Sequence, residues 1–222
     1  MRKKLDPLFL DYATYIKMLD DIEHAYHNNT PMPDKTAHDV PVATTIIPIK
    51  KDHDFTFVSL EKERTVVCFQ SSNDRLDWIS NFRFLQGIRF GLHGGIFHCA
   101  VKFKKELLDL VDPDKKIVVV GHSRGGALAL FIAIFLYKKL KVHIAVMSFG
   151  SPRVVGNRYK KMFNSFTIHY NNVRNRRDPV CRLGIPLFKN VGCIKSLPVP
   201  FLWNFNLHKR HTGYFENIKR LS

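Results

Sequence analysis

The feature that most constrains this chain is a run of β-branched residues that stops abruptly at a glycine and a serine. Residues 116–126 read Lys-Ile-Val-Val-Val-Gly-His-Ser-Arg-Gly-Gly, and residues 125–137 carry no charged side chain. This pattern predicts a buried strand that turns sharply into an apolar helix, with Ser123 on a strained turn. Glycine at positions 121 and 125 fits such a turn, which leaves almost no room for side chains. Because the N-terminus of the helix favours developing negative charge, Ser123 is predicted to be a nucleophile rather than part of an ordinary tight turn.

Length and composition predict one globular domain. The chain has 222 residues, of which 45% are hydrophobic and 12% aromatic, which excludes a disordered chain. Its longest uncharged apolar run, residues 125–137, is too short to span a membrane. The basic start is followed by only four uncharged residues before Asp11, so we expect no signal peptide. We therefore expect a cytoplasmic protein, either free or peripheral at intracellular membranes.

The cysteines and histidines do not predict a metal site. Cysteines at positions 68, 99, 181 and 193 lack the C-x-x-C spacing of zinc ligands, and we expect free thiols. A bond between Cys181 and Cys193 is the alternative in an oxidising compartment. His93 and His98 have no third ligand at useful spacing and are interpreted as structural. We expect neither a metal nor a cofactor.

Positive charge is concentrated in the last third of the chain. The formal net charge is +16, and residues 153–222 carry 14 Lys and Arg against Asp178 and Glu216, a net of +12. A solvated soluble surface is one interpretation, and transient contact with an anionic membrane surface is the other. We expect no nucleic-acid partner, because the basic residues form neither a recognition helix nor an aromatic stacking platform. The sequence makes no prediction of oligomeric state.

Strand-like and helix-like segments alternate along the chain. An α/β fold with a mainly parallel central sheet and helices on both faces is therefore expected. We divide the chain into residues 1–54, an N-terminal helix and irregular arm that packs on the core, and residues 55–222, the main domain. Predicted helices cover residues 8–26, 97–111, 127–137, 159–163 and 212–221; predicted strands cover residues 55–58, 65–69, 117–120, 143–149 and 166–170; residues 30–54 are expected to be irregular.

A nucleophilic serine needs a histidine to accept its proton and a carboxylate to orient that histidine. In enzymes built on this strand-turn-helix element, the chain order is serine, carboxylate, histidine. Only two carboxylates follow Ser123, and only Asp178 precedes a histidine. Two histidines follow Asp178, so chain order alone leaves both His208 and His211 open as the base.

Several segments within residues 60–220 resemble the class 3, fungal-type lipases. The chain reads Phe-Gln-Ser-Ser at 69–72 where that family has F-R-G-[ST], and Asp-Trp-Ile-Ser-Asn at 77–81 at the family's acidic-Trp-x-x-Asn stretch. Residues 118–129 resemble its V-x-G-H-S-L-G-G-A-L-A element. Residues 148–157 resemble T-F-G-x-P-R-V-G-N, and residues 175–183 resemble N-x-x-D-x-V-P-R-L-P.

The resemblance implies an α/β-hydrolase fold and a set of site residues. It favours His211 as the base, because His211-Thr-Gly-Tyr-Phe matches the family's H-x-x-Y-F; Thr212 would then cap the last helix. It assigns the oxyanion hole to Ser72 and to the backbone N–H of Arg124. Two positions depart from the family, which has glycine where Ser71 stands and leucine where Arg124 stands. The Arg124 cation would alter the pocket or meet an anionic head group.

The same resemblance places residues 73–90 where the family has its lid, with a plain core segment as the alternative. Residues 197–203, rich in proline and apolar side chains, would either wall an acyl pocket or cover the sheet. The expected function is hydrolysis of carboxylic esters of lipids, triacylglycerol lipase-like, through a Ser123–His211–Asp178 triad and an acyl-enzyme. The alternatives are a phospholipase or acyltransferase that uses the same triad, and a catalytically weak lipid-surface binding protein.

Overall fold

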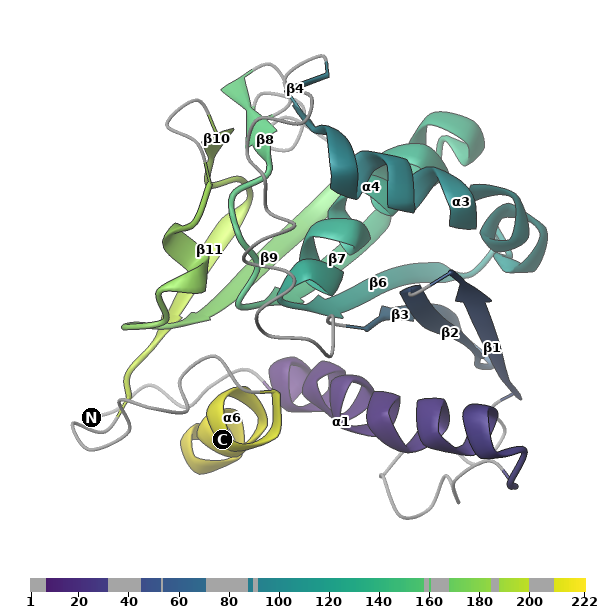
Figure 1. Ribbon diagram of the computed structural model, residues 1–222, viewed down its shortest axis with the longest axis horizontal. Helices are drawn as coiled ribbons and strands as arrows, with labels where there is room; N and C mark the ends of the chain where they lie inside the picture. Colours follow the sequence, from purple (N-terminus) through teal and green to yellow (C-terminus); the bar gives the residue numbers. More distant parts are fainter. Residues whose placement is uncertain are drawn as a thin grey trace.

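The computed structural model describes residues 7–31, 45–52, 54–70, 88–89, 92–157, 160, 168–184, 188–199 and 210–222, with the backbone alone at residues 7, 8, 20, 88, 89, 92, 93 and 210–212. Its main helices and strands alternate along the chain (Figure 1). In chain order they are α1 (Pro7–Asn28), β1 (Thr45–Lys51), β2 (Asp54–Leu60), β3 (Arg64–Phe69), α3 (Gly94–Leu110), β6 (Lys116–His122), α4 (Arg124–Leu140), β7 (Ile144–Phe149), β9 (Ile168–Asn175), η2 (Val180–Arg182), β11 (Cys193–Leu197), the π-helix η3 (Arg210–Phe215) and α6 (Glu216–Leu221).

A central sheet organises the molecule. Among the described residues its strand order is β1-β2-β3-β6-β7-β9-β11. The strands β3, β6, β7, β9 and β11 are mutually parallel, whereas β1, β2 and β3 pair antiparallel. This confirms the predicted α/β fold with a mainly parallel sheet. Two-residue strands form a smaller antiparallel sheet in the order β10 (Phe188–Lys189), β8 (Val155–Gly156), β5 (Leu92–His93) and β4 (Ile88–Arg89).

Helices cover both faces of the central sheet. In Figure 1, α3 and α4 lie on one side, and α1 and α6 lie on the other. Alternate residues of the buried strands point to opposite faces. Val67 and Val119 join the apolar cluster of α3 and α4, whereas their neighbours Val66 and Val118 join the cluster of α1 and α6. The continuous apolar run of these strands is thereby explained, because each strand is buried on both faces.

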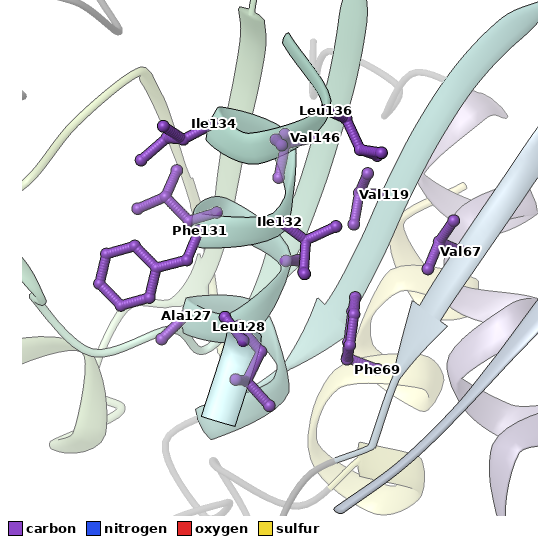
Figure 2. Packing of buried hydrophobic residues seen from close by; sticks show 14 of the residues in the cluster. Val67, Phe69, Val119, Ala127, Leu128, Phe131, Ile132, Ile134, Leu136 and Val146 are labelled. Atoms are coloured by element: carbon purple, nitrogen blue, oxygen red, sulfur yellow. The ribbon is translucent and has the colours of Figure 1, made fainter. Parts of the chain in front are cut away.

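Helix α4 is buried along most of its length, between α3 and the sheet. Figure 2 shows Leu128, Ile132 and Leu136 of this helix among labelled side chains of the sheet such as Val119. A helix that is apolar on all sides is stable only when it is enclosed in this way. Lys141 is the C-cap of this helix. Its backbone is left-handed (φ 60°), and its N–H donates a hydrogen bond to the Tyr137 carbonyl.

A buried polar cluster fastens α1 to the sheet. The Arg64 guanidinium donates to both carboxylate oxygens of Asp11 (2.7 and 3.2 Å), to Glu61 (2.6 Å) and to the Tyr15 hydroxyl (2.9 Å). Tyr15 in turn donates to Glu61, which is 5% exposed. The predicted helix at residues 8–26 is therefore confirmed as α1, and its packing depends on charge pairing as well as on its apolar side.

Two strands of the central sheet, and the two-residue strands of the smaller sheet, lie where the sequence did not predict them. Residues 45–51, expected to be irregular, form β1, and residues 193–197 form β11. Both are at the edges of the central sheet, where half of the backbone groups need no ladder partner, so Pro48 in β1 is tolerated. The predicted helix at 159–163 lies outside the described residues, apart from Lys160. All four cysteines are free thiols, so Cys181 and Cys193 form no disulfide.

The last helical segment begins at Arg210 rather than at Thr212. Its first six residues form the π-helix η3, and α6 continues from Glu216. Thr212 therefore lies inside the helical segment and does not cap it, contrary to the prediction. The residue at the cap position of α6 is Phe215, which makes no side-chain capping hydrogen bond.

Candidate active site

Ser123 occupies a strained turn between β6 and α4. Its backbone dihedrals are φ 56° and ψ −125°, a region that residues with side chains rarely adopt. Its N–H donates to the Phe149 carbonyl at the end of β7 (2.8 Å), and its carbonyl accepts from the Gly126 N–H (3.0 Å). The sharp strand-to-helix turn predicted from the sequence is therefore present, and its strain is held by neighbouring backbone.

The glycines around Ser123 are dictated by close backbone contacts. A Cβ on Gly121 would lie 2.2 Å from the Gly125 carbonyl oxygen. A Cβ on Gly125 would lie 2.4 Å from the Phe69 carbonyl oxygen. Both distances are far below van der Waals contact, so the turn admits no side chain at either position.

The carboxyl ends of parallel strands bring Ser123 and Asp178 to the same edge of the sheet. Ser123 follows β6, Asp178 follows β9, and β7 lies between these strands. Gly150, just after β7, separates the two residues. It directly follows Phe149, the hydrogen-bond partner of Ser123, and a Cβ on it would lie 3.1 Å from Oδ2 of Asp178. The fold thus places the predicted nucleophile and carboxylate on the two sides of one strand end.

The carboxylate of Asp178 is buried and hydrogen-bonded. It is 1% exposed; Oδ1 accepts from the Val180 N–H (2.9 Å), and Oδ2 accepts from the Tyr214 hydroxyl (2.6 Å). The Cys181 thiol lies 3.5 Å from Oδ2. Burial, together with Cys181 and Asp178, raises the pKa of Tyr214 well above its usual value, so the phenol keeps its proton and remains a donor.

The helical segment that carries His211 is attached to the Asp178 loop. Tyr214, three residues after His211 in η3, contacts the carboxylate directly. The Asn175 side chain donates to the Gly213 carbonyl (3.0 Å), and Asn217 donates to the Asn175 side chain (2.8 Å). The backbone of His211 is therefore at the same edge as Asp178, whereas His208 lies outside the described residues.

These supporting polar residues were missed by reasoning from the sequence alone. Asn175 and Tyr214 belong to the two matching family segments, but no role followed for either. Asn217 lies two residues beyond the H-x-x-Y-F segment, and its buried amide gave no signal. The ring of His122 also packs edge-on against Tyr214, with 5.4 Å between ring centroids.

Of the two residues assigned to the oxyanion hole, the structure describes Arg124 but not Ser72. Ser71 also lies outside the described residues. So does the predicted lid segment 73–90, apart from Ile88–Arg89. Arg124 is the first residue of α4 and directly follows Ser123, the predicted nucleophile. Its guanidinium binds Asp54 at the start of β2. Whether this cation alters the pocket or meets an anionic head group stays a prediction.

No group of three His, Cys, Asp or Glu that could hold a metal ion occurs in the described part of the chain. Within the same residues, no helix combines the length and the apolar character that crossing a membrane requires.

Residues 66–187, more than half of the chain, match the sequence profile of Lipase (class 3). The chain belongs to the class 3 lipase family. The secreted mono- and diacylglycerol lipase 1 of Fusarium solani is 29% identical over 133 residues, which are 55% of this chain and 40% of that protein. The lipase of Rhizomucor miehei is 28% identical over 141 residues, which are 55% and 38% of the two chains. The class 3 lipase chain described here thus matches about two fifths of the length of these relatives.

Solved structures of fungal lipases share the fold. The lipase of Rhizopus microsporus var. chinensis superposes with a TM-score of 0.75 at 18% identity, covering 87% of this chain and 75% of the other. A triacylglycerol lipase whose structure is described as having a serine protease triad as its catalytic centre superposes with a TM-score of 0.70 at 22% identity, covering 85% and 78%. The predicted α/β-hydrolase fold and the predicted family are both confirmed.

Proposed function

We propose that this class 3 lipase chain hydrolyses carboxylic ester bonds of lipids, as a triacylglycerol lipase does, with Ser123 as nucleophile. The observation that carries the proposal is the strained Ser123 turn beside the end of β7, with the buried Asp178 on the other side of that strand end. The names of the relatives, a mono- and diacylglycerol lipase and a lipase, support a lipid ester as substrate.

The reaction follows from the roles of three side chains. The Ser123 hydroxyl attacks the acyl carbon while His211 takes its proton, and Asp178 keeps the imidazole oriented and stabilises its positive charge. The oxyanion that forms is held by the Arg124 N–H and by Ser72. Its collapse expels the alcohol, which takes the proton from His211. Water, deprotonated by His211, then attacks the acyl-enzyme and releases the fatty acid, restoring Ser123.

Substitution of each assigned residue tests this proposal. We expect Ser123→Ala, Asp178→Asn and His211→Ala each to lower kcat on butyrate and palmitate esters by about 10⁴-fold. His208→Ala is the matched control, because His208 is the other histidine that chain order allows, and its kcat should stay within twofold. Unchanged turnover in Ser123→Ala refutes the proposal, and a reversed result for the two histidines transfers the role of base to His208.

One observation favours an anionic phospholipid as a second candidate substrate. Arg176, Arg177 and Arg182 flank the Asp178 loop and are exposed. Cations at the edge where an ester would enter attract anionic head groups. Turnover of phosphatidylglycerol vesicles should then exceed that of phosphatidylcholine vesicles, and the difference should shrink between 0.05 and 0.5 M salt, because salt screens surface charge. Equal turnover at all salt concentrations favours a neutral glyceride.

Labelling with a fluorophosphonate separates an enzyme from a catalytically weak lipid-binding protein. Stoichiometric modification of Ser123 supports the enzyme, and no modification of folded protein supports the binding protein.

Location in the cytoplasm, either free or peripheral at intracellular membranes, is likewise a proposal. Fractionation of cells that express the tagged chain tests it.

A further inference from the structure

The residue after the nucleophile poses an electrostatic problem. Arg124 places a cation at the first position of α4, where the aligned peptide dipoles already carry partial positive charge. The first turn of α4 contains no acidic residue that would compensate. A compensating charge must therefore come from another part of the fold.

Asp54, at the start of β2, supplies that charge. Both terminal nitrogens of Arg124 bind the Asp54 carboxylate, Nη1 to Oδ1 and Nη2 to Oδ2, the latter at 3.1 Å. The two side chains are only 19% and 11% exposed. Burial alone would lower the pKa of Arg124, but the hydrogen bonds and charge of Asp54 raise it, so the guanidinium stays charged. A paired, two-point contact of this kind fixes orientation as well as distance.

The Asp54–Arg124 pair joins two elements that both contact the end of β3. The carbonyl of Phe55, next to Asp54, accepts a 3.0 Å hydrogen bond from the N–H of Gln70, the residue just after β3. On the other side, Gly125 packs directly against the carbonyls of Phe69 and Gln70. The Asp54–Arg124 pair therefore ties β2 to the N-terminus of α4 above the last residues of β3.

Few other side chains can hold the start of α4. The hydroxyl of Ser123 must remain available to react, and Gly125 and Gly126 carry no side chain. Arg124 is thus the first side chain of the helix that can anchor the turn. Its N–H is also the donor assigned to the oxyanion, and a displacement of about 0.5 Å is enough to weaken such a contact.

We propose that Asp54 is a positioning residue that, through its paired contact with Arg124, holds the Arg124 N–H where the oxyanion forms. The inference rests on the proposed function, since it assigns a task within the same reaction. Where the family has leucine, this chain has a charged side chain with a partner on the neighbouring strand.

Asp54→Asn and Arg124→Leu test the proposal. Active sites are first counted by end-point labelling with a fluorophosphonate, so that any unfolded fraction does not enter the rates. We expect both variants to lower kcat per labelled site, and the labelling rate constant, by about tenfold, while KM changes less than twofold. Loss of a whole oxyanion donor costs about 10²- to 10³-fold, and a displaced donor should cost less. Both changes remove the Asp54–Arg124 contact, and Arg124→Leu also removes the 3.0 Å contact of Nη2 with the Cys99 sulfur. The double variant should therefore be no slower than Arg124→Leu alone.

Asp52→Asn is the matched control. Asp52 lies two residues before Asp54 and pairs with Lys102 on the surface, with side chains 63% and 34% exposed. Its rates should equal those of the parent. Unchanged rates per labelled site in Asp54→Asn, or additive losses in the double variant, overturn the positioning role. If Ser123 itself is not labelled and Ser123→Ala stays active, the proposed function fails instead, so the two failures are distinguishable.

Discussion

The Tyr214 hydroxyl donates a 2.6 Å hydrogen bond to Oδ2 of Asp178, and thereby connects the helical segment of His211 to the carboxylate assigned to orient it. The same hydroxyl accepts from the Asn175 N–H (3.1 Å), so one phenol joins β9, the Asp178 loop and η3. Because Tyr214 is 1% exposed, water cannot replace either bond.

Tyr214→Phe should impair both catalysis and stability. We expect kcat to fall about tenfold, because roughly 1.4 kcal/mol of barrier corresponds to tenfold in rate and a hydrogen bond to a charged group contributes at least that much. The free energy of unfolding should fall by about 2 kcal/mol. Steady-state kinetics and urea unfolding measure the two effects. Tyr170→Phe is the control: Tyr170 is also buried but bonds Ser148 (2.7 Å), so it should lose stability and keep kcat. Equal kinetic losses in both variants would contradict the role of Tyr214.

Alanine substitutions at three glycines should rank by what each new Cβ meets. Gly121→Ala and Gly125→Ala force a methyl group into backbone oxygens at 2.2 and 2.4 Å, and we expect each to lose more than about 3 kcal/mol of folding free energy. The new methyl group in Gly126→Ala would lie 3.0 Å from the Cβ atoms of Ser148 and Ser151 and 3.2 Å from the Gly121 carbonyl oxygen, and should cost about 1 to 2 kcal/mol. Urea unfolding of the three proteins checks the order, and a Gly125→Ala protein as stable as the parent would contradict the contacts described for the turn.

Arg64→Leu should loosen α1. The substitution leaves Glu61, 5% exposed, without its cation, and removing one partner of a buried ion pair typically costs about 3 to 5 kcal/mol. We expect that loss in urea unfolding, together with faster proteolytic cleavage in α1. Lys51→Ala is the control, because the side chains of its pair with Glu106 are 31% and 38% exposed, and a pair so near the surface should contribute at most about 1 kcal/mol. Similar losses in the two variants would remove the distinction between the buried and the exposed pair.

Stability should fall steeply above pH 10. Burial raises the pKa of Tyr170 to about 12, and burial likewise raises the pKa values of Tyr15 and Tyr214 above their usual value. The stabilisation is complete below the unfolded pKa near 10 and is lost as the pH rises, because the unfolded tyrosines release protons first. Each tyrosine should contribute a slope of about −1.4 kcal/mol per pH unit. Unfolding by urea between pH 9 and 11.5 measures it, and Tyr170→Phe should remove one such contribution; an unchanged slope would contradict the prediction.

The sequence predicts the part of the fold in which local pattern and tertiary burial agree. Residues 116–137 are Val-rich and then uncharged, and they form β6, the Ser123 turn and α4 as expected. By contrast, β1 and β11 are edge strands with one partner each, and most of their residues are half-buried or exposed, so burial does not reinforce their local pattern. In β1, Pro48 also points away from a strand.

The residues of the candidate site likewise divide into those that the sequence predicts and those that it does not. Ser123 and Asp178 follow from motif and chain order, because few carboxylates follow the serine. The partner of Arg124 does not, since Asp54 is 70 residues away and no local pattern joins the two. The role of Tyr214 depends on a turn of helix packing against a loop, which only the assembled fold specifies.

The packing of α1 against the helical segment of residues 210–221 has a consequence for how the proposed site is assembled. Tyr214 and Ile218 share one apolar layer with Leu19 and Ile22 of α1, and Lys17 lies over the ring of Phe215 (5.2 Å to the centroid). The segment that covers α1 in this layer, residues 210–221, also carries the proposed base. Loss of this packing would therefore expose the apolar side of α1 and detach the segment of His211 from the Asp178 loop at the same time. Folding of the apolar layer and assembly of the proposed triad are thus coupled.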